Sequence, residues 1–160
     1  MPDKVFLDTN ILIYLYSESE ANKRQVAYRI LDNHYCVTNL QALNEASNTW
    51  FRKYSWESSK IHSHLDNIEL VCDIILPISR ATINMALSIK DRYGYSYYDC
   101  IMLSSALESN CSIIFTEDMN NGQIISDRLT VINPFTWFWM YNNLLRHTLK
   151  FRYFKFLCSS

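Results

Sequence analysis

Glycine is scarce in this 160-residue sequence, which contains Gly94 and Gly122 and no others. A Walker loop, a G-x-G-x-x-G dinucleotide-binding turn and the G-x-S-x-G turn of serine hydrolases all require closely spaced glycines. The two glycines are too far apart to form any of these motifs. The sequence therefore excludes nucleotide-binding proteins of the first two types and hydrolases of the third.

Long hydrophobic runs are also missing. The longest apolar stretches, such as 11–15 and 74–76, are far shorter than the about 20 residues that a membrane-spanning helix needs. Near the N-terminus Asp3 and Asp8 flank only a short apolar stretch, and no small-residue cleavage site follows it. We therefore expect neither a signal peptide nor a membrane helix.

The five cysteines do not form a pattern that suggests disulfides or zinc. They are odd in number, widely scattered and mostly placed in apolar segments, at Cys36, Cys72, Cys100, Cys111 and Cys158. This distribution indicates reduced, buried thiols, as in a protein of the cytoplasm. We expect a cytoplasmic location on that ground.

Composition and charge divide the chain into two parts. With 49% hydrophobic and 19% charged residues, the chain is suited to one compact domain with a substantial core. All sixteen acidic residues lie before residue 130, whereas the last 25 residues contain four basic and eight aromatic residues and no acid. We expect a domain at 1–135 and an aromatic, basic extension at 136–160.

Three interpretations of the 136–160 extension stay open. It could be an ordered helix that packs on the domain or on a second subunit. It could bind RNA, since aromatic rings stack on bases and Arg or Lys side chains contact phosphates. It could also be a non-native addition to the chain.

Helical and strand patterns alternate along the first 135 residues. Apolar runs predict strands at 5–8, 35–38, 73–76, 111–115 and 129–132. Apolar residues at helical spacing predict helices at 9–16, 21–31, 39–54, 59–72, 83–93 and 96–110. This alternation is typical of an α/β fold with a doubly wound, mainly parallel sheet flanked by helices.

Four acidic residues fall at one edge of this expected sheet. Asp8 closes the first strand, Glu45 lies early in the helix after the second, Asp99 begins a helix, and Asp118 follows a later strand. Clustered carboxylates repel one another and raise each other's pKa, so a protein keeps such a cluster mainly to bind a hard cation. The pattern predicts Mg²⁺ or Mn²⁺, which activates water and neutralises phosphodiester charge. A simpler alternative is that these acids only cap helices or lie on the surface.

The sequence around these acids resembles the PIN domain, and within it the VapC-type ribonuclease toxins of toxin–antitoxin pairs. The similar segments are 6–12, 44–45, 98–101, 116–119 and 121–135. The resemblance implies a three-layer α/β/α fold and a cytoplasmic endoribonuclease. It also implies Mg²⁺ or Mn²⁺ as cofactor, a cognate antitoxin as partner and, as we expect, a homodimer.

The resemblance also assigns roles to individual residues. Asp8 and Asp99 would be the principal metal ligands, and Glu45 and Asp118 would complete the catalytic acidic pocket. Asn10 and Thr116 would hold the carboxylates by hydrogen bonds from outside the metal's coordination shell. Glu117 adjoins Asp118, but strand alternation predicts that its side chain points the other way.

Two rival functions remain open from the sequence. Acids at strand ends also occur in Mg²⁺-dependent phosphatases and receiver domains, but these use a nucleophilic or phosphorylated Asp with a Lys or Thr partner. A PIN-like RNA- or protein-binding module without activity is the second rival. Loss of one of the acids would indicate it, and all four are present.

Overall fold

The computed structural model describes residues 3–136, which form a layered α/β domain. The strands are β1 (Lys4–Leu7), β2 (Tyr35–Asn39), β3 (Ile74–Leu76), β4 (Ile113–Phe115), β5 (Ile124–Ile125) and β6 (Leu129–Ile132). The helices are α1 (Thr9–Leu15), α2 (Ala21–Asn33), α3 (Leu40–Tyr54), α4 (Ser58–Val71), α5 (Arg80–Tyr93) and α6 (Tyr97–Glu108). Residues 137–160, most of the expected extension, lie outside the described part.

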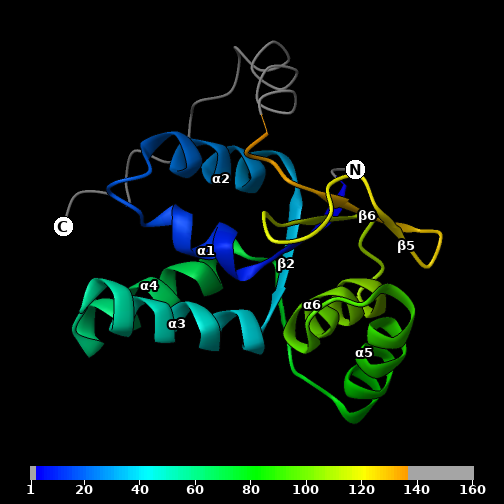
Figure 1. Ribbon diagram of the computed structural model, residues 1–160. Coiled ribbons are helices and arrows are strands. Elements are labelled where there is room, and N and C mark those ends of the chain that lie inside the picture. The colour runs from blue at the N-terminus through cyan, green and yellow to red at the C-terminus, as the bar shows by residue number, and fades with distance from the viewer. Residues whose placement is uncertain (1–2, 137–160) are drawn as a thin grey trace.

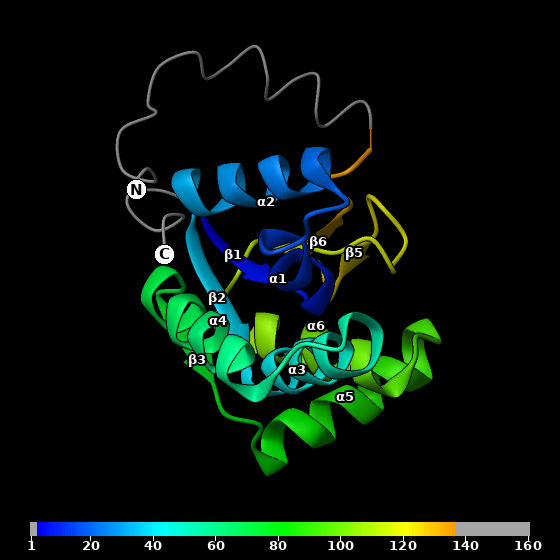
Figure 2. The same ribbon diagram turned by 90° about the vertical axis from the view of Figure 1, so that its left-hand side faces the viewer.

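The six strands form a single sheet in the order β3-β2-β1-β4-β6-β5. All neighbouring pairs are parallel except β5 and β6, which are antiparallel. Helix α2 and the α5–α6 pair lie on opposite sides of this sheet in both views (Figures 1 and 2). The arrangement confirms the predicted doubly wound, mainly parallel α/β sheet with a three-layer organisation.

Local sequence signals explain where several helices begin and end. The Asn39 side chain accepts a 2.8 Å hydrogen bond from the backbone N–H of Ala42 and caps α3. Ser79 and Thr82 form a reciprocal capping box at the start of α5. Gly94 ends α5 with φ +77°, a left-handed conformation that glycine adopts without steric cost.

The core lies between the central strands and the helices that cover them. The apolar residues of β1 are fully buried, and every residue of α6 from Cys100 to Leu107 is buried as well. Trp50 of α3 is the largest of the fully buried side chains. Because β1 and α6 are buried in a densely packed core, the acidic residues at the ends of these two elements are held rigidly in place.

The structure differs from the sequence-based expectation at both edges of the sheet. The strand expected to be buried at 73–76 is β3, whose residues are only half-buried because it forms one edge. The short β5 was not predicted, and it forms the other edge beside β6.

Cys36, Cys72, Cys100 and Cys111 are buried and free, whereas Cys158 lies outside the described residues. Within residues 3–136, no helix is long and apolar enough to cross a membrane.

Candidate functional site

The register between β1 and β4 brings Asp8 beside Thr116. These two parallel strands pair Leu7 with Phe115, so the residues that follow them emerge together at the carboxyl edge of the sheet. Thr116 Oγ1 donates a 2.6 Å hydrogen bond to Asp8 Oδ2. The other carboxylate oxygen, Oδ1, accepts a 2.7 Å bond from the backbone N–H of Thr9, so Asp8 also caps α1. Asp8 therefore caps a helix, as the simpler alternative expected, and its role as a metal ligand stays a prediction.

A pocket of about 320 Å³ opens beside Asp8. All four predicted acids line it, together with other residues of α1 and α3: Asp8, Thr9, Asn10, Ile13, Glu45, Asn48, Thr49, Asp99 and Asp118. The acids come from four different elements of the chain, spread over more than a hundred residues. The fold thus gathers the residues that the sequence placed at one edge, whereas their catalytic roles stay a prediction.

Asn10 connects three of the predicted site residues. Its side-chain Nδ2 lies 3.1 Å from Asp118 Oδ2, 3.3 Å from Thr116 Oγ1 and 3.4 Å from Asp8 Oδ2. The Asp118 backbone N–H also donates a 3.2 Å hydrogen bond to Thr116 Oγ1. Asn10 and Thr116 therefore hold Asp8 and Asp118 by hydrogen bonds, as the resemblance implied for these two positions.

Burial strongly affects the ionisation of Asp8. Its side chain is almost inaccessible, with 4% exposure. Burial raises the pKa of Asp8 to about 7, and the nearby charges of Asp99 and Asp118 act in the same direction. The bonds from Thr116 and the Thr9 amide only partly oppose this rise in pKa. A carboxyl group with this pKa is only partly ionised at neutral pH, and a nearby cation would favour its charged form.

The donor set fits a hard divalent cation. Mg²⁺ in proteins is bound through one or two carboxylates and several waters. The polar side chains described above supply carboxylate, hydroxyl and amide groups. Asn10 Oδ1 is buried without a hydrogen-bond partner, so it is an unused acceptor beside Asp8 and Asp118. No group of three or more His, Cys, Asp or Glu side chains among residues 3–136 converges closely enough to ligate an ion. A divalent ion in this pocket would therefore be held directly by at most two of these side chains, and water would have to complete its coordination.

Sequence reasoning missed several residues that orient the acids. Thr9 Oγ1 donates a 2.9 Å bond to Glu45 Oε2, and Gln41 Nε2 donates a 2.8 Å bond to Glu45 Oε1. Ser96 Oγ donates a 2.7 Å bond to Asp99 Oδ2 and caps α6. Gln41 and Ser96 lie four and three residues before their acids, a helical spacing that could have revealed them.

Two other pocket residues, Asn48 and Thr49, were also overlooked. They lie on α3 one turn after Glu45, so their positions follow from the same helical periodicity. The Thr49 hydroxyl donates to the backbone carbonyl of Glu45, and Asn48 is exposed at the pocket.

Glu117 points away from the pocket, as strand alternation predicted. Lys23 Nζ of α2 lies 2.7 Å from Glu117 Oε2, and the Tyr14 hydroxyl of α1 donates to Glu117 Oε1. Partial burial acts to lower the pKa of Lys23, but the bonds to Glu117 and Tyr14 outweigh it and hold that pKa above its usual value. Lys23 is therefore a stable cation next to the acidic pocket.

Comparison with known proteins places this arrangement in a family. Residues 5–121 match the PIN domain, and that range contains all four acids as well as Asn10 and Thr116. The chain belongs to the PIN domain family. No curated protein matches its sequence.

Solved structures share the PIN fold of this chain at low sequence identity. A toxin–antitoxin complex from Klebsiella pneumoniae superposes with a TM-score of 0.60 at 20% identity, covering 82% of this chain and 98% of that one. VapBC2 from Rickettsia felis, bound to a promoter DNA fragment, gives a TM-score of 0.59 at 17% identity, with coverages of 81% and 99%. The sarcin–ricin loop cleaving toxin VapC20 from Mycobacterium tuberculosis gives 0.57 at 16% identity, with coverages of 69% and 86%.

Proposed function

We propose that this PIN-domain protein is a Mg²⁺- or Mn²⁺-dependent endoribonuclease, the toxin of a toxin–antitoxin pair. The observation that carries the proposal is the single pocket lined by Asp8, Glu45, Asp99 and Asp118, beside the unpartnered Asn10 Oδ1. The PIN-fold neighbours from toxin–antitoxin complexes support the same function.

Asp8 and Asp99 would hold the divalent ion, which supplies Lewis-acid activation of water and neutralises phosphodiester charge when bound. Thr116 and the Thr9 amide orient the two oxygens of Asp8, and Ser96 orients Asp99. These hydrogen bonds fix the carboxylates before any ligand arrives, so little reorganisation is needed when the substrate binds.

Glu45 and Asp118 complete the pocket. Glu45 is fixed by bonds to both of its oxygens, and in the proposed reaction it would accept a proton from the attacking water. Asp118 is exposed, and among the described residues its side chain is hydrogen-bonded to Asn10. In the proposed reaction it would bind water held by the metal, on the side of the pocket where RNA would enter.

The partners follow from the same proposal. We infer that RNA is the substrate, that a cognate antitoxin holds the protein inactive, and that the toxin is a homodimer in the cytoplasm. VapC20, one of the structural neighbours, is a toxin that cleaves the sarcin–ricin loop, which is consistent with an RNA substrate for this fold.

Cleavage of an RNA panel in Mn²⁺ by the wild-type protein, Asp8→Asn and Asp99→Asn tests the proposal. We expect cleavage by the wild type, loss of cleavage in EDTA and at least a hundredfold slower cleavage by both variants, since each removes a charged ligand. Asp91→Asn is the matched control, because Asp91 is exposed on α5 and does not line the pocket. Equal rates for Asp8→Asn and the wild type would overturn the assignment.

A further inference from the structure

The described part of the chain, residues 3–136, contains a single ion pair within 4 Å, between Lys23 and Glu117. It lies directly beside the acidic pocket, because Glu117 precedes Asp118. Surface ion pairs contribute little to stability, typically below about 1 kcal/mol, when both side chains are free in solvent. Here the Lys23 and Glu117 side chains are only 29% and 23% exposed, so neighbouring residues restrict the movement of both.

Tyr14 and Phe135 enclose the Lys23–Glu117 pair. Lys23 Nζ donates a 2.7 Å bond to the Tyr14 hydroxyl, which in turn donates to Glu117. The Tyr14 and Phe135 rings meet edge to face with centroids 5.0 Å apart, and Lys23 Nζ lies 4.3 Å and 5.3 Å from their centroids. We call Tyr14, Lys23 and Glu117, with Phe135 against them, the Glu117 clamp.

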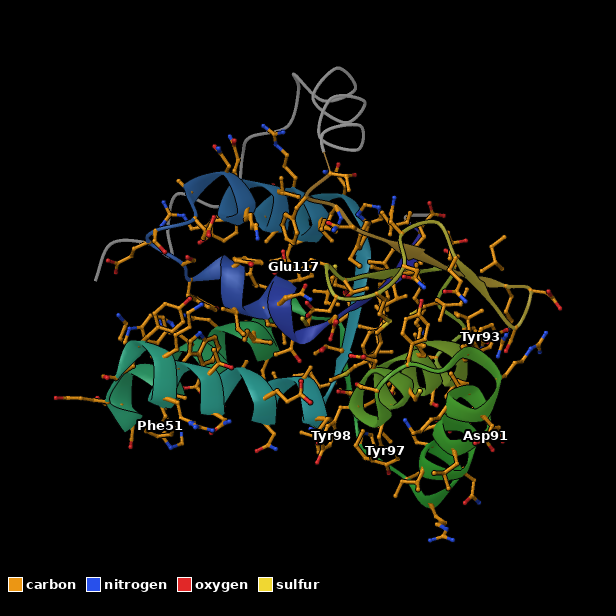
Figure 3. The ribbon with its side chains drawn as sticks, viewed as in Figure 1. Phe51, Asp91, Tyr93, Tyr97, Tyr98 and Glu117 are labelled. Carbon is orange, nitrogen blue, oxygen red and sulfur yellow. The ribbon has the colours of Figure 1, made fainter. Side chains whose placement is uncertain are left out.

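The Glu117 clamp ties the segment after β4 to two helices. Tyr14 belongs to α1 and Lys23 to α2, and Figure 3 shows Glu117 beside α1 on the side that faces α2. The next residue, Asp118, is exposed and turns to the opposite side, into the pocket. Its remaining anchors are long hydrogen bonds of 3.1 Å and 3.2 Å to Asn10 and Thr116. The strongest charge-assisted anchor of this segment is therefore Glu117.

We propose that Lys23 is a positioning residue for Asp118, acting through Glu117 and Tyr14. The clamp fixes the backbone at Glu117, which sets the direction of the neighbouring Asp118 side chain. The role of the Glu117 clamp in RNA cleavage rests on the proposed function, whereas its effect on the conformation of residues 116–119 does not. The alternative is a purely electrostatic role, in which Lys23 only neutralises a fifth carboxylate next to four others.

A positioning role of Lys23 and a purely electrostatic role predict different outcomes for the Lys23→Met and Glu117→Gln variants. If the clamp positions Asp118, each variant breaks it and lowers kcat by about tenfold with little change in the KM for RNA, and the double variant is no worse. If only charge matters, Lys23→Met adds net negative charge and Glu117→Gln removes it. The two variants would then change Mn²⁺ affinity in opposite directions, and the double variant would restore it.

Three further variants complete the test. Lys23→Arg keeps the charge and the donors, so it should recover most of the activity. Tyr14→Phe removes the hydroxyl but keeps the ring against Phe135, and should lower kcat in the same way as Lys23→Met. Arg24→Met is the matched control, since Arg24 is the next residue of α2 and its side chain has no hydrogen bond or ion pair with residues 3–136. It should leave activity unchanged.

Amide hydrogen exchange gives a readout that does not depend on activity. We expect Lys23→Met to speed exchange at Asp118 and Met119 by about tenfold, with β1 and β4 unchanged. Unchanged exchange and unchanged kcat would overturn the proposal, as would opposite effects of Lys23→Met and Glu117→Gln. A wild-type protein inactive on RNA would contradict the proposed function, and faster exchange in Lys23→Met would still support the clamp.

Discussion

Thr116 Oγ1 donates a 2.6 Å hydrogen bond to Asp8 Oδ2, joining two residues 108 positions apart in the chain. The contact follows directly from the parallel register of β1 and β4, which ends both strands at the same level. Both side chains are buried, so the bond is shielded from water. Thr116 is thereby the residue that fixes the deepest carboxylate of the candidate site.

Replacing Thr116 with Val removes this bond while keeping the side-chain shape. We expect the free energy of unfolding to fall by about 2 kcal/mol, because a buried charge-assisted hydrogen bond is lost. We also expect RNA cleavage in Mn²⁺ to slow by about tenfold, since Asp8 loses its orienting partner. Urea unfolding and initial cleavage rates measure the two effects.

Thr130→Val is the control for Thr116→Val. Thr130 is half-buried on β6, and its hydroxyl makes no side-chain hydrogen bond with the described residues. This variant should leave both stability and cleavage near the wild-type values. A Thr116→Val protein that cleaves as fast as Thr130→Val would contradict the orienting role.

The raised pKa of Asp8 makes the stability of the protein depend on pH. Burial raises this pKa from about 3.8 to about 7, so between these values the folded protein binds more protons than the unfolded chain. In EDTA, the free energy of unfolding should therefore fall as pH rises from about 4 to about 7, by a few kcal/mol in total. Urea unfolding across this pH range measures the decline.

Asp8→Asn isolates the contribution of Asp8 from that of all other groups. Asn caps a helix as well as Asp does, so α1 should keep its N-terminus. The wild type should be less stable than Asp8→Asn at pH 8 in EDTA and should approach it near pH 4. A difference between the two proteins that does not vary with pH would show that Asp8 titrates normally. Saturating Mn²⁺ should stabilise the wild type and leave Asp8→Asn unaffected.

The scarcity of glycine leaves a strained turn between β5 and β6. Ser126 and Asp127 have φ values of +49° and +59°, and Arg128 N–H bonds to the Ile125 carbonyl, which together define a tight hairpin turn. Asn-Gly is favoured at the two central positions of such turns. We expect the Ser126→Asn, Asp127→Gly double variant to raise the free energy of unfolding by about 1 kcal/mol. The same free energy as the wild type would show that the turn is not strained.

A comparison of Ser96 with another N-cap serine can distinguish the loss of a helix cap from the loss of metal binding. Ser96→Ala and Ser79→Ala each remove a helix N-cap, of α6 and α5, and each should destabilise the protein by about 1 kcal/mol. Only Ser96 also donates to Asp99, so only Ser96→Ala should weaken Mn²⁺ binding in calorimetry. Equal Mn²⁺ affinity in the two variants would contradict the role of Ser96 in holding Asp99.

Local signals made the order of the elements and the location of the acids predictable. Asn39 and Gly94 mark a helix start and a helix end in the sequence as they do in the structure. Asp8 and Asp118 follow apolar strands, and parallel strands end at a shared edge, so their convergence could be inferred before the fold was known. The PIN-like segments added the roles assigned to Asn10 and Thr116.

Contacts that depend on how elements dock could not be predicted. Strand β5 has two residues, too few for an alternating pattern, and it is defined only by its pairing with β6. The contact between Lys23 and Glu117 joins α2 to the segment after β4, and nothing in the sequence fixes the angle at which α2 crosses the sheet. The orienting bond from Thr9 to Glu45 likewise requires α1 to pack on α3.

The central claim is that a divalent cation binds between Asp8 and Asp99. A crystal structure of the protein soaked in Mn²⁺, with anomalous diffraction measured near the manganese edge, tests this claim directly. We predict one or two anomalous peaks within about 2.5 Å of carboxylate oxygens of Asp8 or Asp99, and none in Asp8→Asn. A fully occupied manganese peak elsewhere, with none in this pocket, would contradict it.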